Sequence, residues 1–167
     1  MEYVVPHMKL IPQDHTMSCW FASGQMVIEW RRVTRRMTEL AHPSPAQVAQ
    51  WQKLYNDNTG MTNEQISNYA RDLGLCRVPP LSPTADAIKS WLQSYGPLWV
   101  NGVQHITVIA GIRAAPGKVQ VLVYDPARPH KQHGEWRDFD KWYYGDKWSG
   151  RDVSKAVDTV FLYAPAL

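Results

Sequence analysis

A chain of 167 residues is long enough for one domain with a substantial core and too short for two ordinary domains, so we expect a single domain over residues 1–167. Hydrophobic residues make up 44% and charged residues 20%, which is the balance of a globular protein and argues against intrinsic disorder. The formal net charge of +3 is too small to indicate nucleic acid as the main partner.

Membrane and export signals are missing from this sequence. No apolar run approaches the roughly 18 residues of a membrane-spanning helix. The first residues lack the basic region and the long apolar core of a signal peptide. We therefore expect no membrane segment, and a chain of this kind that leaves its cell needs another route.

Two cysteines, Cys19 and Cys76, are too few for a disulfide scaffold, which uses several bridges in place of a core. A single bridge between them is left open by the sequence. Neither cysteine lies in a CxxC motif, and the six histidines form no HxxxH or HExxH pattern. His130 and His133 stand in a Pro- and Lys-rich stretch that is typical of an exposed loop. We therefore expect no metal and no other cofactor.

The first half of the chain predicts helices. Ser44 followed by Pro45 suits a helix start, since serine can cap and proline is tolerated at the first helical position. A capping box is suggested by Thr62-Asn-Glu-Gln, and Gly96-Pro97 would stop the last helix. From these signals and from apolar residues at amphipathic spacing, we expect helices at residues 20–33, 46–54, 62–73 and 84–94.

After Pro97 the pattern changes to short β-branched runs separated by glycine and proline, which is typical of strands. The segment 116–118 suits the turn of a hairpin between two of them. We expect strands at residues 98–101, 106–112, 119–124 and 159–163. Helices followed by strands, without regular alternation, indicate an α+β fold with an antiparallel sheet. Its helical part would cover about residues 1–96 and its sheet part about residues 97–167.

A basic cluster, made of Arg31, Arg32, Arg35 and Arg36, lies at the end of the first expected helix. Cations suit that end of a helix because they oppose its dipole, so we expect a solvated face. Binding of phosphate, membrane or nucleic acid at this cluster is the alternative. Strongly salt-dependent binding to DNA or RNA would support it.

Cys19 stands where a loop becomes the first helix, in the sequence Gln-Asp-His-Thr-Met-Ser-Cys-Trp at residues 13–20. Unpaired N–H groups and the dipole at a helix N-terminus stabilise a thiolate, which is the nucleophilic form of cysteine. A free cysteine is also a common small core residue, so the position alone assigns no role. Companion residues are needed to decide between the two interpretations.

A thiol nucleophile needs a base, an orienting group for that base, and donors for the oxyanion. Gln13 can supply a side-chain amide beside the backbone N–H of Cys19. His105 opens one expected strand and Asp125 ends the next, so a hairpin would place both at the same end of the sheet. His15 is nearer to the cysteine in sequence, but we expect it to be exposed in the loop.

Together these residues resemble a papain-like cysteine peptidase, with the bacterial AvrRpt2-like effector peptidases and the C39-type peptidase domains as the nearest branches. The resemblance covers roughly residues 4–126. It is carried by the glutamine six residues before the cysteine, by Ser-Cys-Trp-x-Ala-Ser-x-Gln-Met, by Gly-Pro-Leu-Trp-Val before the histidine, and by Asp-Pro. It implies Cys19 as nucleophile, His105 as general base and then acid, Asp125 as orienter and Gln13 as oxyanion donor.

The resemblance implies a protease that cleaves a target protein through an acyl-enzyme. The same triad serves deamidases, acyltransferases and peptidoglycan amidases, which differ in acceptor and cleft. A non-catalytic binding module of the same fold is a further alternative, which the occupied catalytic positions disfavour. By resemblance we expect a monomeric bacterial effector or toxin. It would be delivered by a specialised secretion system, act in the target-cell cytoplasm, and be restrained by an immunity or inhibitor protein.

Four further features of the sequence concern residues around these motifs. Trp20 should pack beneath the site, and Cys76 should be a buried spectator because nothing nearby supplies a base. Asn101 and the segment 96–99 either help form a substrate wall or simply lead into a core strand. Gln104 stands where many relatives in the family place glycine before the histidine.

Overall fold

The computed structural model describes residues 1–34, 41–79, 82–102, 105–144 and 157–166, without the side chains of 157–159. Expectations that rest on Arg35, Arg36 and Gln104 fall outside these ranges. The elements in chain order are β1 (Glu2–Val4), α1 (Cys19–Val33), the 3₁₀ turn η1 (Pro45–Gln47), α2 (Ala49–Asn56), α3 (Asn63–Asp72), β2 (Cys76–Arg77), α4 (Ala85–Tyr95), β3 (Leu98–Gly102), β4 (Ile106–Ala115), β5 (Lys118–Tyr124), β6 (Glu135–Asp138), α5 (Phe139–Tyr144) and β7 (Val157–Tyr163).

Within the described residues, seven strands form one antiparallel sheet. Six of them follow the order β2-β7-β3-β4-β5-β6, and β1 pairs separately with β4. The long strand β4 pairs with β3 over residues 106–109 and with β1 over residues 111–113, while β5 lies along its other edge. The helices lie mostly in the N-terminal part and the sheet mostly in the C-terminal part, so the expected α+β architecture is confirmed.

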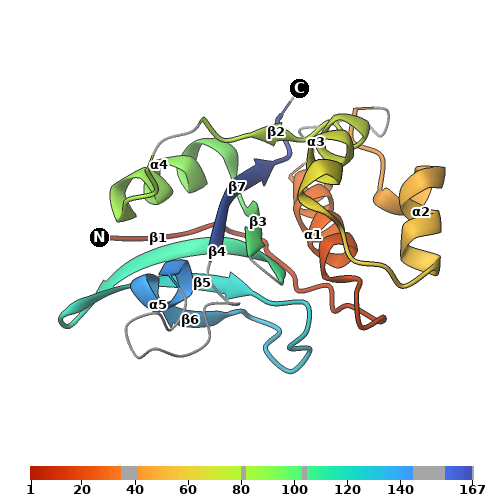
Figure 1. The fold of residues 1–167 in the computed structure, drawn as a ribbon. Helices are drawn as coiled ribbons and strands as arrows, with labels where there is room; N and C mark the ends of the chain where they lie inside the picture. Colours follow the sequence, from red (N-terminus) through yellow and green to blue (C-terminus); the bar gives the residue numbers. More distant parts are fainter. Residues whose placement is uncertain (35–40, 80–81, 103–104, 145–156, 167) are drawn as a thin grey trace.

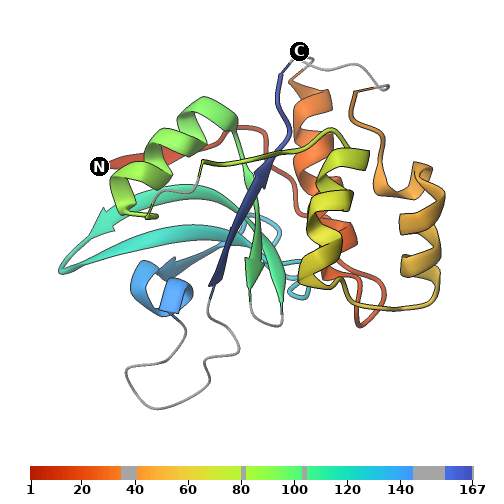
Figure 2. The ribbon, with the colours of Figure 1, turned by 45° about the horizontal axis from the view of Figure 1, so that its top comes forward.

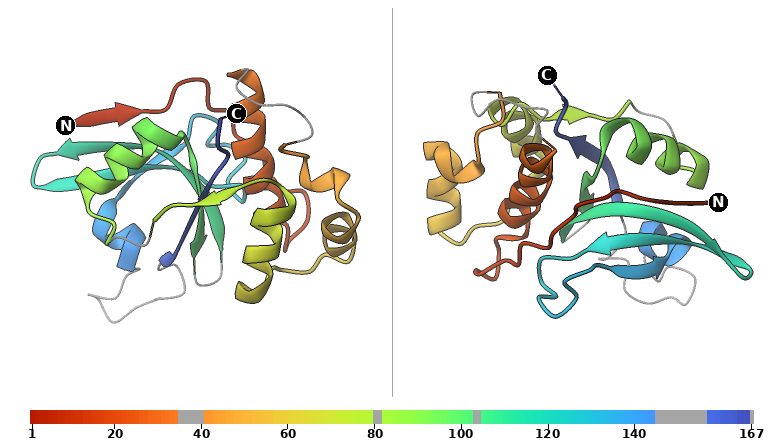
Figure 3. Two further views of the ribbon diagram at one scale, coloured as in Figure 1. Left: turned by 90° about the horizontal axis from the view of Figure 1, so that it is seen from above. Right: turned by 180° about the vertical axis from the view of Figure 1, so that it is seen from behind.

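The helices take different positions around this sheet. Figures 1 and 3 show α1, α2 and α3 gathered at one side, with α1 and α3 nearer to the sheet and α2 farther out. The contacts of α1 run to β3 and β4. Helix α4 lies against β4 and β1, whereas α5 packs against β5, β6 and β7 (Figure 2). The first turn of α1 is therefore carried by a helix that packs directly on the central strands.

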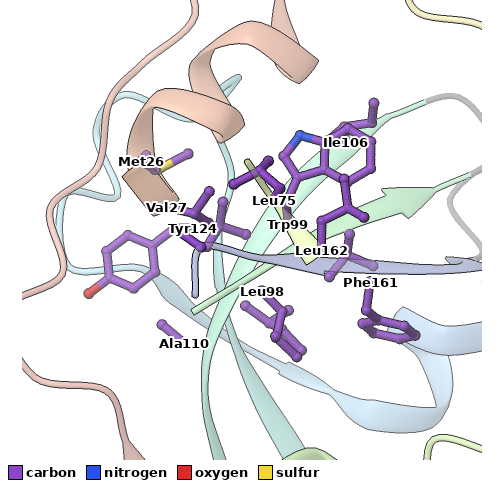
Figure 4. Packing of buried hydrophobic residues seen from close by; sticks show 14 of the residues in the cluster. Met26, Val27, Leu75, Leu98, Trp99, Ile106, Ala110, Tyr124, Phe161 and Leu162 are labelled. Carbon is purple, nitrogen blue, oxygen red and sulfur yellow. The ribbon is translucent and has the colours of Figure 1, made fainter. Parts of the chain in front are cut away.

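The hydrophobic core joins α1 to the central strands. Figure 4 shows Met26 and Val27 of α1 in one cluster with side chains of the sheet, among them Leu98, Trp99 and Ala110. Residues 98–101 of β3 and 106–112 of β4 are buried throughout, as expected for strands covered on both faces. Burial of this much apolar surface is the main force that holds the helix against the sheet.

An aromatic cluster fixes the beginning of α1. Trp20 and Trp51 are fully buried, and their rings lie 5.7 and 5.3 Å from that of Tyr69, in edge-to-face contacts. The Tyr69 hydroxyl and the Trp99 indole N–H both donate to the Trp20 carbonyl, at 3.1 and 3.2 Å. The expected packing of Trp20 in the core is confirmed, and these polar groups are paired as buried groups must be.

Local capping signals explain where α3 and α4 begin and end. At α3 the Thr62 N–H donates to the Gln65 side chain at 2.8 Å, which is one arm of the expected capping box. At α4 the Thr84 hydroxyl accepts the Ala87 N–H at 3.1 Å. Gly96, which ends α4, has a φ of 83°, a left-handed conformation that glycine adopts readily. These two helices were predicted to within about two residues.

The second expected helix is divided in the structure. The Ser44 hydroxyl accepts the Ala46 N–H at 3.3 Å, but the segment that it opens is only the 3₁₀ turn Pro45–Gln47. Val48 is extended, with φ −109° and ψ 113°, and α2 begins after it at Ala49. The capping residue was therefore predicted correctly, but it starts a 3₁₀ turn and not the expected helix.

Other expectations are corrected by long-range contacts. The short strands β1, β2 and β6 and the helix α5 were not predicted, and the first two join the sheet from the part expected to be helical. Arg31 is buried, and its guanidinium donates to the Ala164 carbonyl at 2.7 Å and to the Tyr95 carbonyl at 3.2 Å. The expected solvated arginine face is thus wrong for Arg31, because it joins the helix to the C-terminal strand.

Candidate active site

Cys19 is the first residue of α1 and follows the Gln13 loop, which we define as residues 13–18. The loop is closed by Ser18, whose hydroxyl donates to the His15 carbonyl at 3.0 Å and accepts the His15 N–H at 3.2 Å. Within the described residues, Ser18 makes no side-chain cap on α1, and the Cys19 N–H has no backbone partner. Donors of the first turn are thus left available to an anion beside the thiol.

The turn between α2 and α3 forms hydrogen bonds with the Gln13 loop and with Trp20. The Asn58 side chain accepts the Met17 N–H at 3.0 Å and donates to the Thr16 hydroxyl at 2.9 Å. The next residue, Thr59, accepts the Trp20 indole N–H at 3.0 Å through its carbonyl. Asn58 has a φ of 49°, which asparagine tolerates better than most residues. The loop before the cysteine is therefore positioned by a segment distant in sequence.

His105 and Asp125 lie at the same end of the sheet. His105 directly precedes β4 and Asp125 directly follows β5, and these strands are antiparallel neighbours. The imidazole Nε2 lies 2.6 Å from the Asp125 Oδ1 atom. Because the carboxylate engages Nε2, the ring orientation and tautomer are fixed, and Nδ1 is the nitrogen that remains for the thiol.

The Cys19 thiol lies close enough to His105 to raise the pKa of its imidazole. This proximity depends on how α1 packs on the sheet. Ser23 is fully buried one turn after Cys19, and its hydroxyl donates to the Ile106 carbonyl at 3.3 Å. Since Ile106 is the residue after His105, this bond joins the helix that carries Cys19 to the strand that follows His105. The structure thereby brings Cys19, His105 and Asp125 together.

The charges of the site stabilise one another. Burial lowers the pKa of His105, but hydrogen bonds with Asp125 and the Cys19 thiol outweigh it and raise the pKa to about 9. Burial raises the pKa of Asp125, but His105, Arg137 and the Ala127 N–H together hold that pKa well below its usual range. At neutral pH the site therefore contains an imidazolium beside an ionised carboxylate.

Gln13 lies beside these residues, with its amide turned into its own loop. Its backbone N–H donates to the Pro126 carbonyl at 2.9 Å, so the Gln13 loop and the segment after Asp125 lie side by side (Figure 3, right). Its Nε2 donates to the His15 and Thr16 carbonyls at 3.0 and 3.1 Å. Its Oε1 is buried and has no partner among the described residues. Both amide N–H groups are thus engaged within the loop in this state.

The expected solvent exposure of His15 and the expected burial of Cys76 are both wrong. His15 is half-buried rather than exposed, because its ring stacks on Tyr55 at 4.3 Å and its Nδ1 lies 3.1 Å from the Tyr55 carbonyl. Cys76 is exposed rather than buried, because it lies on the short strand β2 at an edge of the sheet. Both thiols are free, so no bridge joins Cys19 to Cys76.

The segment considered as a substrate wall belongs to the core. Leu98 and Trp99 are fully buried, and both lie in β3 between β4 and β7. The Asn101 side chain is also buried, and its amide donates to Asn63 of α3 at 3.1 Å. This supports the simpler interpretation, a turn that leads into a central strand.

Two residues of the site were missed from the sequence. Arg137 of β6 donates to the Asp125 Oδ2 atom at 3.0 Å, and Ser23 forms the bond to Ile106 described above. Ser23 belongs to the Ser-Cys-Trp-x-Ala-Ser pattern and lies four residues after Cys19, which is the spacing of one helical face. Its helical position could have been noticed, whereas the pairing of β6 has no comparable local signal.

The described residues contain no group of three or more His, Cys, Asp or Glu side chains placed to hold a metal ion. No helix in this part of the chain has the length and apolar character that a membrane crossing requires.

Comparisons with known proteins address both family and fold. Residues 2–157 match the family described as papain-like cysteine protease AvrRpt2. Nine chains of solved structures match, including the crystal structure of UfSP from C. elegans, with a TM-score of 0.57 and 13% identity over 99% of this chain and 35% of that chain. The search of curated proteins gave no significant match. By the family match over most of its length, the chain belongs to the AvrRpt2 family of papain-like cysteine proteases and is a cysteine-type peptidase.

Proposed function

We propose that this peptidase cleaves peptide bonds in a target protein through Cys19, His105 and Asp125, by way of an acyl-enzyme. The proposal is supported by the 2.6 Å distance between His105 Nε2 and Asp125 Oδ1, together with the raised pKa that the nearby Cys19 thiol and Asp125 give the imidazole. Nucleophile, base and orienting carboxylate then follow one another in the order that the reaction requires.

In the acylation step the Cys19 thiolate attacks the carbonyl carbon of the scissile bond. The C–S bond forms as the carbonyl π electrons move to oxygen. The His105 imidazolium then donates its Nδ1 proton to the amide nitrogen as the C–N bond breaks. Because the raised pKa of about 9 keeps the imidazole protonated at neutral pH, this proton is available when the amine leaves. The products of the step are a free amine and a thioester on Cys19.

The oxyanion formed in this step needs donors that are already in place. We propose the Cys19 backbone N–H as the first donor and the Gln13 amide as the second. Since Nε2 of Gln13 now donates to the His15 and Thr16 carbonyls, it has to exchange one of these bonds for the oxyanion. The exchange replaces a neutral acceptor by a charged one, which favours it.

Water completes the reaction in the deacylation step. Neutral His105 removes a proton from the attacking water, and the C–S bond breaks to release the carboxylic acid. The electron pair returns to sulfur, so Cys19 is again a thiolate beside an imidazolium. Asp125 holds the ring in one orientation through both steps because its Oδ1 stays on Nε2.

Protein termini provide the direct test of this function. Cells that express the wild type and cells that express Cys19→Ala are compared for newly formed termini by proteomics. We expect new termini with the wild type alone, and the same termini with the control Cys76→Ser, which removes the other, exposed thiol. Identical termini in the wild-type and Cys19→Ala samples would remove the support for peptide cleavage by this site.

A second experiment separates peptide cleavage from the related reactions of deamidases and peptidoglycan amidases. A deamidase with this triad would release ammonia from a protein glutamine and create no termini, and a peptidoglycan amidase would act on cell-wall fragments only. Incubation with a casein-like protein and with peptidoglycan, with ammonia measured in both, distinguishes these outcomes. We expect protein cleavage without ammonia release.

We further propose that the chain acts as one monomeric domain, and as a bacterial effector or toxin that is delivered into a target cell and restrained by an inhibitor protein. The support is the similarity to AvrRpt2-like effector peptidases. Expression in the cytoplasm of candidate target cells should be toxic for the wild type and harmless for Cys19→Ala. Deletion of a small neighbouring gene in the producer should cause self-poisoning that Cys19→Ala relieves, and survival of the unprotected producer would contradict restraint by that gene product.

A further inference from the structure

Strand β6 places an arginine on the far side of the Asp125 carboxylate. The two oxygens of Asp125 have different partners: Oδ1 faces His105 Nε2 at 2.6 Å, and Oδ2 accepts from Arg137 Nη2 at 3.0 Å. Asp125 is buried, with 7% of its surface exposed, whereas the Arg137 side chain is 29% exposed. The carboxylate thus lies between the imidazole and the guanidinium.

The guanidinium is itself held by a second carboxylate. Glu135 precedes Arg137 by two residues on β6, so both side chains lie on the same face of the strand. The Glu135 Oε2 atom accepts from Arg137 Nε at 3.2 Å and from Nη2 at 3.1 Å. Arg128 and Lys131, from the loop between β5 and β6, approach Glu135 at 3.5 and 3.8 Å. The position of Arg137 is therefore determined by strand geometry and by Glu135 together.

An aspartate needs such a support to orient a histidine. The terminal torsion of a carboxylate has a broad energy minimum, so one hydrogen bond leaves the plane of the group free to turn. Asp125 Oδ1 already accepts both His105 and the Ala127 N–H, at 2.6 and 2.9 Å. A fixed donor on Oδ2 defines the plane, and a planar guanidinium is the side chain best suited to that task.

An ordinary surface ion pair contributes little to stability, because solvent screens the two charges. The pair of Arg137 with Asp125 differs because one partner is buried and already engaged by the base of the site. Without Arg137 the Oδ2 atom would lose its protein partner, which is costly for a buried charged group. The loss of Arg137 should therefore lower the rate at which the Cys19 thiol reacts.

We propose that Arg137 is a positioning residue of the triad, which fixes the Asp125 carboxylate so that its Oδ1 atom orients His105 toward Cys19. The inference rests on the proposed roles of these three residues. Arg137 touches no substrate in this account and acts only through Asp125.

A double-mutant cycle on Arg137 and Asp125 tests the proposal. The readout is the rate at which iodoacetamide alkylates Cys19 near neutral pH, in a Cys76→Ser background so that one thiol reacts. In this reaction the thiolate displaces iodide, and no peptide substrate or oxyanion is involved. We expect Arg137→Met to slow alkylation about tenfold when Asp125 is present, and by less than about twofold in the Asp125→Asn background, since the coupling passes through that carboxylate.

Control variants separate positioning from general structural damage. Arg113→Met removes another arginine of the sheet, which donates to Gln120 and stacks on Trp136, and it should leave the rate within about twofold of the parent. Arg137→Lys keeps the charge but loses the planar fork, so it should recover part of the rate. If Arg137→Met fails to fold in a thermal denaturation assay, Glu135→Gln takes its place and should show a smaller loss that again requires Asp125.

Equal fold losses in both backgrounds would overturn the inference, because a residue that acts through Asp125 cannot act without it. An Arg137→Met variant that is alkylated at the parent rate with Asp125 present would overturn the inference as well. Failure of the proposed function is a separate outcome. If the alkylation cycle gives the expected coupling while no peptide is cleaved by the wild type, peptide cleavage is rejected and the positioning role of Arg137 stands.

Discussion

The two halves of the site are held in place by different forces. On one side, the start of α1 is fixed by fully buried aromatic rings, Trp20, Trp51 and Tyr69, and by hydrogen bonds to its backbone. On the other side, His105 and Asp125 are held at the end of the sheet by a series of charged hydrogen bonds. Changes on the first side should therefore reduce stability, whereas changes on the second should reduce activity and shift its pH dependence.

The largest effect is expected at the charged side. His105→Ala removes the proposed general acid and base of the reaction, so kcat should fall by about 10⁴-fold or more. The thermal midpoint should change by only a few degrees, because the side chain is about one-third exposed and lies outside the aromatic cluster. Steady-state kinetics measures kcat, and thermal denaturation of the same preparation measures the midpoint. A large loss of stability with this variant would abolish the contrast between the halves.

A second test concerns the oxyanion. Gln13→Ala should lower kcat by about 10²- to 10³-fold, the usual effect of removing one oxyanion donor. The alkylation rate of Cys19 by iodoacetamide should stay within about threefold of the parent, since alkylation forms no oxyanion. A small shift of the Gln13 loop accounts for the change expected within this range. Equal losses in both assays would show that Gln13 acts by holding the loop through His15 and Thr16, not as a donor.

The packed side is tested at Gly24. A Cβ atom at this position would lie 1.8 Å from the Tyr69 hydroxyl oxygen. Alanine gains about 1 kcal/mol of helix propensity, but overpacking and loss of the Tyr69 bond to Trp20 outweigh it, so the free energy of unfolding should fall by about 2 kcal/mol. Chemical denaturation measures this change, and kcat at a temperature where the variant is folded should stay near the wild-type value.

A matched variant sharpens this prediction. Tyr69→Phe removes the oxygen that meets the new methyl group, so Gly24→Ala should cost less in that background than in the wild type. If the cost is the same in both backgrounds, the contact with the Tyr69 hydroxyl does not determine the stability of this side.

The smallest effect is the pH dependence of activity. The pKa of His105 is raised to about 9, so the imidazolium is present below that pH and is lost as the pH rises through it. The value of kcat/KM should therefore fall about tenfold per pH unit on the alkaline side. Asp125→Asn removes a carboxylate that raises this pKa, and its alkaline limb should move to lower pH. An alkaline limb at the same pH in both proteins would contradict the role of the carboxylate.

The sequence predicted the parts of the site that depend on local structure. Cys19 was located by its loop-to-helix junction, and His105 and Asp125 by the ends of two strands joined by a tight turn. In a hairpin the turn brings the two strand ends together, although the exact β4–β5 register also depends on a shift between Ile109 and Gly111 that the sequence did not predict. Local residues also predicted α3 and α4, whose capping residues are adjacent to the helices that they start.

The parts that were missed depend on contacts between distant segments. Arg137 reaches Asp125 only because β6 pairs with β5 after an intervening loop, and a four-residue strand has too few residues for a clear periodicity. Arg31 was expected in solvent because its neighbours are charged, yet it binds the Ala164 carbonyl 133 residues away. Cys76 is likewise exposed because β2 is an edge strand, and the order of strands in a sheet cannot be predicted from the residues around Cys76.

The charge state of His105 tests most directly whether Cys19, His105 and Asp125 form one site. Its ring nitrogens can be followed by NMR as the pH is raised, in the wild type, in Cys19→Ala and in Asp125→Asn. We predict a pKa of about 9 in the wild type and lower values in both variants, because the thiol and the carboxylate each raise it. Titration near the ordinary value of 6.5 in all three proteins would contradict the assembly of Cys19, His105 and Asp125 into one site.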